Sequence, residues 1–80
     1  MAMEFAQQTA IITGAASGIG KAIAFRMLEN GATVYALDMD AAKLQEYYAG
    51  LSGKAFPVAI DITDENRVRE VFNDIIGQAG

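Results

Sequence analysis

The chain has 80 residues, enough for one small domain, and 52% of them are hydrophobic, which is typical of a folded globular chain and excludes a disordered one. Its formal net charge is -4 and it has no long run of basic residues, so neither nucleic acid nor an anionic membrane is an expected partner. Cysteine and histidine are both absent, which excludes a disulfide framework, a thiolate metal site and histidine as a general base, and no metal site is predicted.

The amino-terminal residues do not resemble a targeting signal. A cationic segment followed by a long apolar run is missing, and no stretch approaches the roughly 18 apolar residues of a membrane-spanning helix. We therefore expect a cytoplasmic location. Residues 1–6 are interpreted as a short leader without an assigned function.

The first two predicted elements are a strand and a helix joined by a glycine-rich turn. Thr9 to Thr13 is a short apolar run without strict alternation, which is typical of a strand buried on both faces of a parallel sheet. Ile19 to Asn30 is rich in helix-forming residues and is followed by Gly31, a common C-terminal signal of a helix.

A second strand and a short helix follow. Thr33 to Asp38 is β-branched, aromatic and largely apolar, and it ends on a carboxylate. Asp40 can cap a helix over residues 41–48, in which Leu44, Tyr48 and Leu51 fall at helical spacing.

The last strand and helix are predicted over the remaining residues. Residues 54–60 form a strand that contains Pro57, which cannot donate a ladder hydrogen bond and therefore belongs on a sheet edge or beside a bulge. Thr63 is the expected N-cap of a final helix, with negative charge from Asp64 and Glu65 in its first turn. Its apolar stripe consists of Val68, Val71, Phe72, Ile75 and Ile76.

The order of these elements predicts an α/β fold. Strands that alternate with helices through short connections form right-handed crossovers and a parallel sheet. We therefore expect a Rossmann-type βαβαβα arrangement with a three-stranded parallel sheet in the order 3-2-1, the first half of a doubly wound fold. Residues 7–80 would form this one domain.

The turn between the first strand and helix is the strongest functional signal. Gly14 would permit the sharp turn, Gly18 would let a pyrophosphate approach the backbone, and Gly20 would let the helix pack closely on the sheet. The free N–H groups and the positive end of the helix would then face the phosphates. The alternative is that the glycines only form a tight turn.

The acid at the end of the second strand favours a dinucleotide. Asp38 follows Gly20 by eighteen residues, close to the roughly 20-residue spacing of a carboxylate that binds the adenosine ribose, although it could also be a strand-end or capping acid. Its charge would repel a 2′-phosphate, and neither Ser17 nor Met39 supplies a compensating cation, so NAD is favoured over NADP. Asp61 ends the third strand on the same rim, or is a turn residue.

The loop resembles that of the short-chain dehydrogenase/reductase family, whose Thr-Gly-x-x-x-Gly-x-Gly pattern is matched by Thr13, Gly14, Gly18 and Gly20. The resemblance covers residues 7–80 and implies that the acid ending the second strand selects NAD and that Asp61-Ile62 contacts the adenine. The predicted cofactor-binding residues are Gly14, Ser17, Gly18, Ile19, Gly20, Asp38, Met39, Asp61 and Ile62.

No catalytic residue is assigned. The family's catalytic Ser and Tyr-x-x-x-Lys pair are not found, and neither Tyr47 nor Tyr48 is followed four residues later by a lysine. A complete relative would transfer hydride between NAD and an alcohol or carbonyl, whereas this chain alone is expected to be inactive. Two other functions stay open: a self-associating fragment that binds no cofactor, and a site for another nucleotide, although the Gly-Lys-Ser/Thr ending of an ATP-binding P-loop is missing.

An oligomer is also predicted. If the first strand lies at an edge of the sheet, Ile11 and Ile12 belong to an unpaired apolar strand, which invites pairing with a second copy. Tyr48 is expected to face the sheet.

Overall fold

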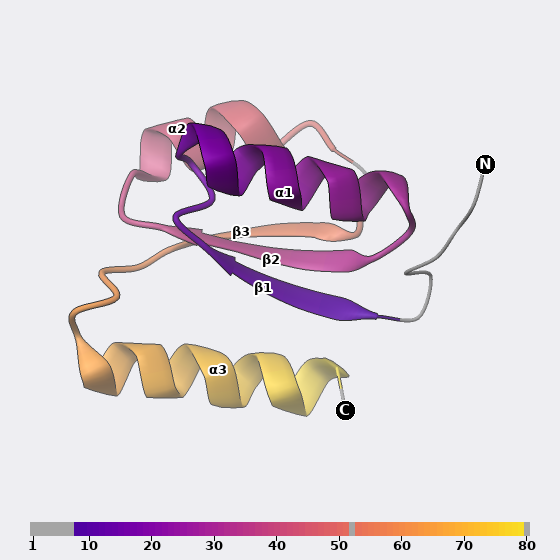
Figure 1. Cartoon of the computed structure of the whole chain (residues 1–80). Helices are drawn as coiled ribbons and strands as arrows, with labels where there is room; N and C mark the ends of the chain where they lie inside the picture. The colour runs from indigo at the N-terminus through magenta and orange to yellow at the C-terminus, as the bar shows by residue number, and fades with distance from the viewer. Residues whose placement is uncertain (1–7, 52, 80) are drawn as a thin grey trace.

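The structure is a computed structural model that describes residues 8–51 and 53–79, so the expected leader at residues 1–6 lies outside the described residues. Three strands alternate with three helices along the chain (Figure 1). They are β1 (Thr9–Thr13), α1 (Gly18–Glu29), β2 (Thr33–Asp38), α2 (Ala41–Tyr48), β3 (Ala55–Ala59) and α3 (Glu65–Ala79). The predicted βαβαβα arrangement is confirmed: β1, β2 and α2 have the predicted bounds, and the bounds of α1 and β3 and the start of α3 differ by one residue.

The sheet has three parallel strands in the order β1-β2-β3, which confirms the predicted order 3-2-1. Thr9 is aligned with Thr33 in the first pair of strands, and Val34 is aligned with Ala55 in the second. Pro57 lies in β3, at an edge of the sheet, as its missing N–H predicts. All three strands therefore end at the same rim, where their carboxyl ends meet the following loops.

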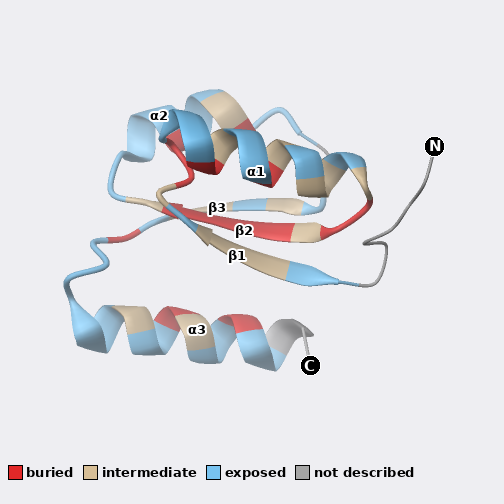
Figure 2. Ribbon diagram, in the orientation of Figure 1, coloured by how far each residue is buried: buried red, intermediate tan, exposed pale blue. Residues whose placement is uncertain are grey.

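The helices form layers on both sides of the sheet. Helices α1 and α2 cover one face and α3 covers the other (Figure 1). The central strand β2 is the most buried element of the sheet (Figure 2). Val34, Ala36, Leu44 and Tyr48 belong to the cluster on the α1/α2 side. The cluster on the α3 side contains Tyr35, Leu37, Ile60, Val71 and Ile75. Successive side chains of β2 thus point alternately into two separate cores, which explains its continuous apolar sequence.

The N-cap of α3 differs from the prediction. Thr63 is not the cap, because Asp64 Oδ1 accepts the hydrogen bond from the Arg67 backbone N–H at 3.1 Å and α3 begins at the next residue. Thr63 instead donates its backbone N–H and its hydroxyl to Asp61 Oδ1. Aspartate is at least as good a cap as threonine, and the competing bond to Asp61 removes Thr63 from the helix start.

Two residues of the predicted apolar stripes are exposed. Ile76 of α3 is 63% exposed and Leu51, just beyond α2, is 40% exposed, whereas Val71, Ile75 and Tyr48 are buried as predicted. The stripes are therefore narrower than the sequence spacing suggests. Within the part of the chain that the structure describes, the helices are too short or too polar to cross a bilayer.

Candidate functional site

The glycines of the loop between β1 and α1 serve different purposes. Gly14 has a φ of +68°, in the left-handed region that side chains rarely adopt. A Cβ on Gly20 would collide with the backbone of Gly14, lying 2.8 Å from its carbonyl carbon, so the close approach of α1 to the loop requires glycine there. A Cβ on Gly18 would meet no atom within 4 Å. Backbone conformation therefore explains Gly14 and close packing explains Gly20, but neither explains Gly18.

The start of α1 is capped by an uncharged side chain. Ser17 Oγ accepts a hydrogen bond from the Gly20 N–H at 3.1 Å and donates one to the Gly14 carbonyl at 2.6 Å. The first turn of α1 contains no acidic residue. The Lys21 ammonium lies 3.9 Å from the centroid of the Tyr47 ring, against α2. The positive end of the helix is thus not neutralised by an acidic side chain of its own first turn.

Asp38 is held against the glycine loop. Its Oδ2 accepts a hydrogen bond from the Ala16 N–H at 3.0 Å, and its Oδ1 accepts one from the Asp40 N–H at 2.9 Å. The carboxylate therefore also makes the bonds of a capping acid, the alternative that the sequence left open. Because each carboxylate oxygen has two lone pairs, one bond to each oxygen leaves acceptor capacity for a ligand.

Asp61 lies in the turn between β3 and α3. Hydrogen bonds from the hydroxyl and then from the backbone N–H of Thr63 hold the pKa of the Asp61 carboxyl below its ordinary value. Asp61 is exposed and therefore stays ionised at neutral pH, and both bonds from Thr63 are accepted by the same oxygen, Oδ1. The turn arrangement that the sequence left open is confirmed.

The structure brings several predicted residues together around one pocket at the rim. The pocket has a volume of about 180 Å³ and is lined by Gly14, Asp38, Met39, Ile60 and Ile62. Four of these were predicted from the sequence. Ile60 was expected only as a strand residue, and no motif singles it out as a site residue. Its position directly before the acid that ends the third strand is the signal that could have found it.

The remaining predicted residues lie next to this pocket without lining it. They belong to the start of α1, in the case of Ser17, Gly18, Ile19 and Gly20, or to the turn after β3, in the case of Asp61. Ile19 is 78% exposed and Met39 is 67% exposed, which is unusual for large apolar side chains in a folded domain. Ile62 is 53% exposed as well, so three apolar side chains of the predicted site are exposed.

Helix α2 also contacts the glycine loop, through Tyr48. The hydroxyl of Tyr48 donates a hydrogen bond of 2.7 Å to the Ala15 carbonyl. Burial raises the pKa of Tyr48, and the negative charge of Asp38 raises it further. The expectation that Tyr48 faces the sheet is confirmed, but no pattern in the sequence indicates this bond.

A βαβαβα unit with a parallel sheet and a glycine-rich loop between β1 and α1 is the opening half of a Rossmann-type fold. The sequence profile described as short chain dehydrogenase matches residues 8–80. The chain belongs to the short-chain dehydrogenase/reductase family and corresponds to its amino-terminal part. Members of this family use NAD or NADP.

Curated relatives support this assignment. The chain is 36% identical over 81 residues to a 3-oxoacyl-[acyl-carrier-protein] reductase of Thermotoga maritima, covering 98% of this chain and 33% of the relative. It is 37% identical over 79 residues to dehydrogenase/reductase SDR family member 1 of Homo sapiens, covering 94% of this chain and 25% of the relative. The chain thus spans between a quarter and a third of these relatives.

Solved structures show the same relationship. A citronellol catabolism dehydrogenase of Pseudomonas aeruginosa matches 100% of this chain and 35% of its own length, with a TM-score of 0.89 and 32% identity. A 3-ketoacyl-(acyl-carrier-protein) reductase of Brucella melitensis, complexed with NADH, matches 91% of this chain and 30% of its own length, with a TM-score of 0.82 and 33% identity. The predicted fold is therefore found in relatives of known structure.

Proposed function

We propose that this chain binds the adenosine half of NAD at the carboxyl-end rim of its sheet, as the amino-terminal part of an oxidoreductase. The observation that carries the proposal is the position of Asp38, whose carboxylate is fixed 3.0 Å from the Ala16 N–H of the glycine loop. A ribose acceptor and a phosphate-binding helix start are thereby neighbours. The pyrophosphate would lie over Gly18, where a Cβ would meet no protein atom within 4 Å. The amino-terminal N–H groups of α1 would face it.

The adenosine would occupy the pocket beside the loop. Asp38 would accept hydrogen bonds from the ribose hydroxyls, and the adenine would lie between Met39 and Ile62. Asp61, which stays ionised at neutral pH, would accept a hydrogen bond from the adenine amino group. About 180 Å³ is small beside the roughly 300–1,000 Å³ of a typical ligand pocket, in keeping with a site for half a dinucleotide.

We propose NAD as the preferred cofactor because of the charge at this rim. A 2′-phosphate would lie beside the Asp38 carboxylate, and like charges in contact repel. Lys21 is the cation in the first turn of α1, but its ammonium lies over the rings of Tyr47 and Phe25. The neutral Ser17 and Met39 offer no compensation.

In a complete relative, hydride would pass between NAD and an alcohol or carbonyl group. The sequence does not define the substrate of such an enzyme, and sugars, steroids and acyl chains are all open as substrate classes. The chain alone is expected to be inactive, because it supplies no Tyr-x-x-x-Lys pair. Its affinity for NAD should be weak, on the order of millimolar, because only part of the dinucleotide would be held. A cytoplasmic location stays a prediction.

Self-association through β1 is a second proposal, and it also supports the alternative of a fragment that binds no cofactor. The Thr33 N–H donates to the Gln8 carbonyl, so by alternation Ala10 and Ile12 direct their backbone groups toward β2 while Ile11 directs its groups outward. Residues 9–13 contain no charge and no proline that would protect the edge. Two copies could pair these edges around a two-fold axis.

Thermal unfolding with and without NAD tests the binding proposal. A ligand present at ten times its dissociation constant stabilises the folded state by about 1.4 kcal/mol, which corresponds to a rise in Tm of roughly 6–11 °C for a domain of this size. NADP at the same concentration should give a smaller rise. Equal shifts with both cofactors would contradict the preference for NAD, and an unchanged Tm with either would favour the fragment that binds no cofactor.

Asp38→Asn is the sharper variant, with Asp74→Asn as its control. The asparagine keeps a carbonyl oxygen for the Ala16 N–H, loses the acceptor of the Asp40 N–H and removes the charge, so the response to NAD should fall and the response to NADP should rise relative to the response to NAD. Asp74→Asn makes the same change in net charge on an exposed residue of α3. If both variants respond alike, Asp38 is not part of the site.

Size-exclusion chromatography with light scattering tests self-association through the edge of β1. The wild-type chain should be a dimer at high micromolar concentration and should dissociate on dilution. Thr9→Pro removes an outward N–H from the exposed start of β1, while Ala10 and Ile12 keep their bonds to β2, so this variant should dimerise more weakly. A wild-type monomer at high concentration would contradict the proposal.

A further inference from the structure

The hydroxyl of Tyr48 lies in the interior of the protein, next to the glycine loop. The residue is 1% exposed, and its hydroxyl donates to the Ala15 carbonyl at 2.7 Å across 33 residues of sequence. A buried phenol must find a partner, and most apolar sites avoid the problem by using phenylalanine. The hydroxyl therefore distinguishes Tyr48 from a phenylalanine through its contact with the backbone of the loop.

The same short segment is held from β2 as well. The Ala15 N–H donates to the Leu37 carbonyl at 3.1 Å, and the Ala16 N–H donates to Asp38 Oδ2 at 3.0 Å. Together with the Tyr48 hydroxyl, these bonds fix both the N–H and the carbonyl of Ala15. Ala15 is fully buried, so water cannot replace the hydroxyl if it is removed.

The position of the segment determines the geometry of the loop on its carboxyl side. Ala15 and Ala16 connect the left-handed Gly14 to Ser17, the N-cap of α1. A displacement of Ala15 would therefore move the peptide groups that lead into the start of α1. Tyr48 extends from α2, on the same side of the sheet as α1, and its ring contacts Phe25 of α1 edge-on at 5.5 Å between centroids.

We propose that Tyr48 is a positioning residue for the phosphate loop, acting from α2 through the Ala15 carbonyl. The inference rests on the proposed NAD site and adds to it a residue that touches no cofactor. The ring fills the space between α1 and α2, as a phenylalanine would, and the hydroxyl sets the backbone that precedes the start of α1. Loop geometry, and with it phosphate binding, then depends on one oxygen atom of α2.

The adjacent tyrosines provide a matched pair of variants. Tyr48→Phe removes the hydroxyl and keeps the ring, and Tyr47→Phe removes the same atom from the neighbouring residue, whose ring is contacted by Lys21. Both variants should be folded at 25 °C, which circular dichroism would verify.

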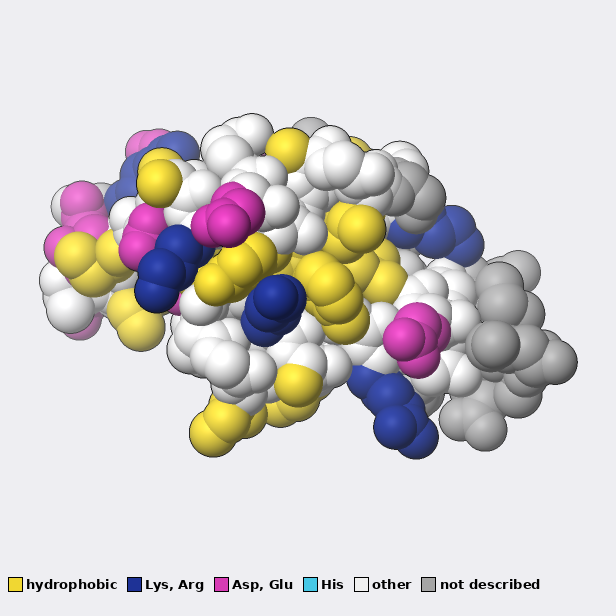
Figure 3. All heavy atoms as spheres, turned by 90° about the horizontal axis from the view of Figure 1, so that it is seen from above, with side chains coloured by type: hydrophobic (Ala, Val, Ile, Leu, Met, Phe, Trp, Pro, Cys, Tyr) yellow, Lys and Arg dark blue, Asp and Glu magenta, His cyan; other side chains and the backbone are white. Residues whose placement is uncertain are grey.

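Figure 3 shows the side of the molecule from which α1 and α2 are seen, where hydrophobic side chains gather near the middle of the face.

Two measurements on the full 80-residue chain separate positioning from general stability. Backbone amide exchange by NMR should become about five- to tenfold faster at Ala16 and Ser17 in Tyr48→Phe, relative to amides of β2 in the same variant, because a lost bond to a buried carbonyl is worth a factor of this size. The dissociation constant for NAD should rise by a similar factor. Tyr47→Phe should match the wild type in both measurements.

Each outcome decides something. Loop exchange that is equal in the two variants overturns the inference, and so does faster exchange with an unchanged affinity for NAD. A wild-type chain without any response to NAD overturns the proposed function instead. In that case the contrast in exchange between the variants still determines whether Tyr48 fixes the loop.

Discussion

Substituting Gly20 by alanine should destabilise the fold, against the usual effect of alanine in a helix. A Cβ at this position would lie 2.8 Å from the Gly14 carbonyl carbon and 3.2 Å from the Ala15 Cα, and both contacts are with backbone that cannot rotate away. Overpacking of this kind costs about 1–3 kcal/mol. Alanine recovers roughly 0.5–1 kcal/mol of helix propensity, and a backbone contact of 2.8 Å places the overpacking cost in the upper half of its range, so the net loss should be about 1–2 kcal/mol.

Gly18→Ala is the control that makes this prediction specific. Gly18 is also in the first turn of α1, but a Cβ there would meet no atom within 4 Å, so the free energy of unfolding should stay unchanged or increase. Thermal unfolding followed by circular dichroism would show Gly20→Ala melting roughly 4–16 °C below the wild type, and Gly18→Ala at or above it. Gly20→Ala melting with the wild type would refute the packing argument. Gly18→Ala should nevertheless lose its response to NAD, since its methyl group would occupy the space proposed for the pyrophosphate.

Three further predictions follow from the hydrogen bonds around the rim. Ser17→Ala should lower the free energy of unfolding by about 1 kcal/mol through the lost cap of α1, measured by urea denaturation; an unchanged midpoint would show that the cap is replaced by water. Because burial holds the pKa of Tyr48 above its ordinary value, the unfolded chain deprotonates first, and stability should fall as the pH rises above about 10. Tyr48→Phe should make this alkaline fall shallower in pH-dependent melts, and an identical fall in the variant would contradict the shift. Thr63→Val removes the hydroxyl bond that contributes most to the lowered pKa of Asp61, so that pKa should rise toward its ordinary value in an NMR titration of the carboxyl carbon, and a constant pKa would assign the effect to the backbone bond alone.

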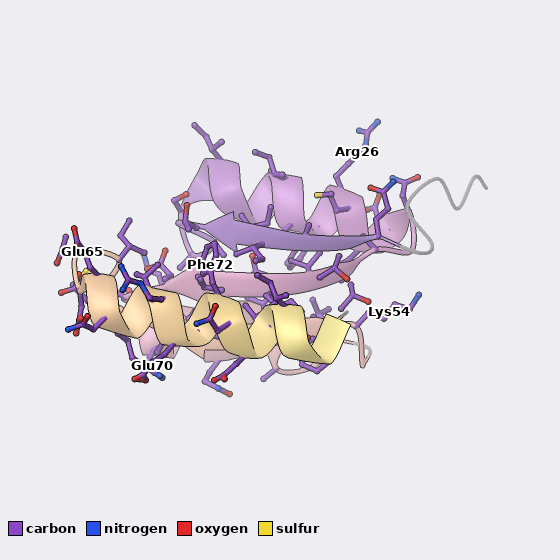
Figure 4. All side chains as sticks on the ribbon, turned by 90° about the horizontal axis from the view of Figure 1, so that it is seen from below. Arg26, Lys54, Glu65, Glu70 and Phe72 are labelled. Atoms are coloured by element: carbon purple, nitrogen blue, oxygen red, sulfur yellow. The ribbon has the colours of Figure 1, made fainter. Side chains whose placement is uncertain are left out.

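The architecture could be predicted because each element is defined by local patterns. The apolar strands, the helix-forming stretch after Gly18 and the proline at position 57 each restrict the local structure, and the order 3-2-1 then came from assigning the chain to the first half of a doubly wound fold. The stripe of α3 was also correct in its centre, where Val71 and Ile75 are buried. It failed at Ile76, because a helix that covers a three-stranded sheet contacts it along a narrow line. Figure 4 shows α3 lying across this face, with Phe72 toward the β1 side and Glu70 on the opposite side.

The connections between distant residues could not be predicted in the same way. The sequence placed Asp38 at the rim because of its spacing from the glycines, but not its bond to Ala16, which depends on how closely β2 approaches the loop. The bond from Tyr48 to Ala15 depends in turn on the angle between α2 and the sheet. Thr63 and Asp64 are both suitable cap residues, and Asp64 is the cap because Thr63 is hydrogen-bonded to Asp61. Tertiary contacts decided each of these cases.

The helix starts differ in charge in a way that bears on function. Asp40 caps α2 with a carboxylate, and α3 begins with Asp64 and Glu65, so acidic side chains of the chain itself lie at the positive ends of these two helices. Helix α1 begins instead with Ser17 and has no acidic residue in its first turn. A neutral cap forgoes a favourable charge interaction of about 0.3–1 kcal/mol, which the other two helices use for stability. At α1 the carboxylate of Asp38 reaches only the Ala16 N–H, which precedes the cap, so an anion bound at the N–H groups of the first turn would add the interaction that the neutral cap lacks.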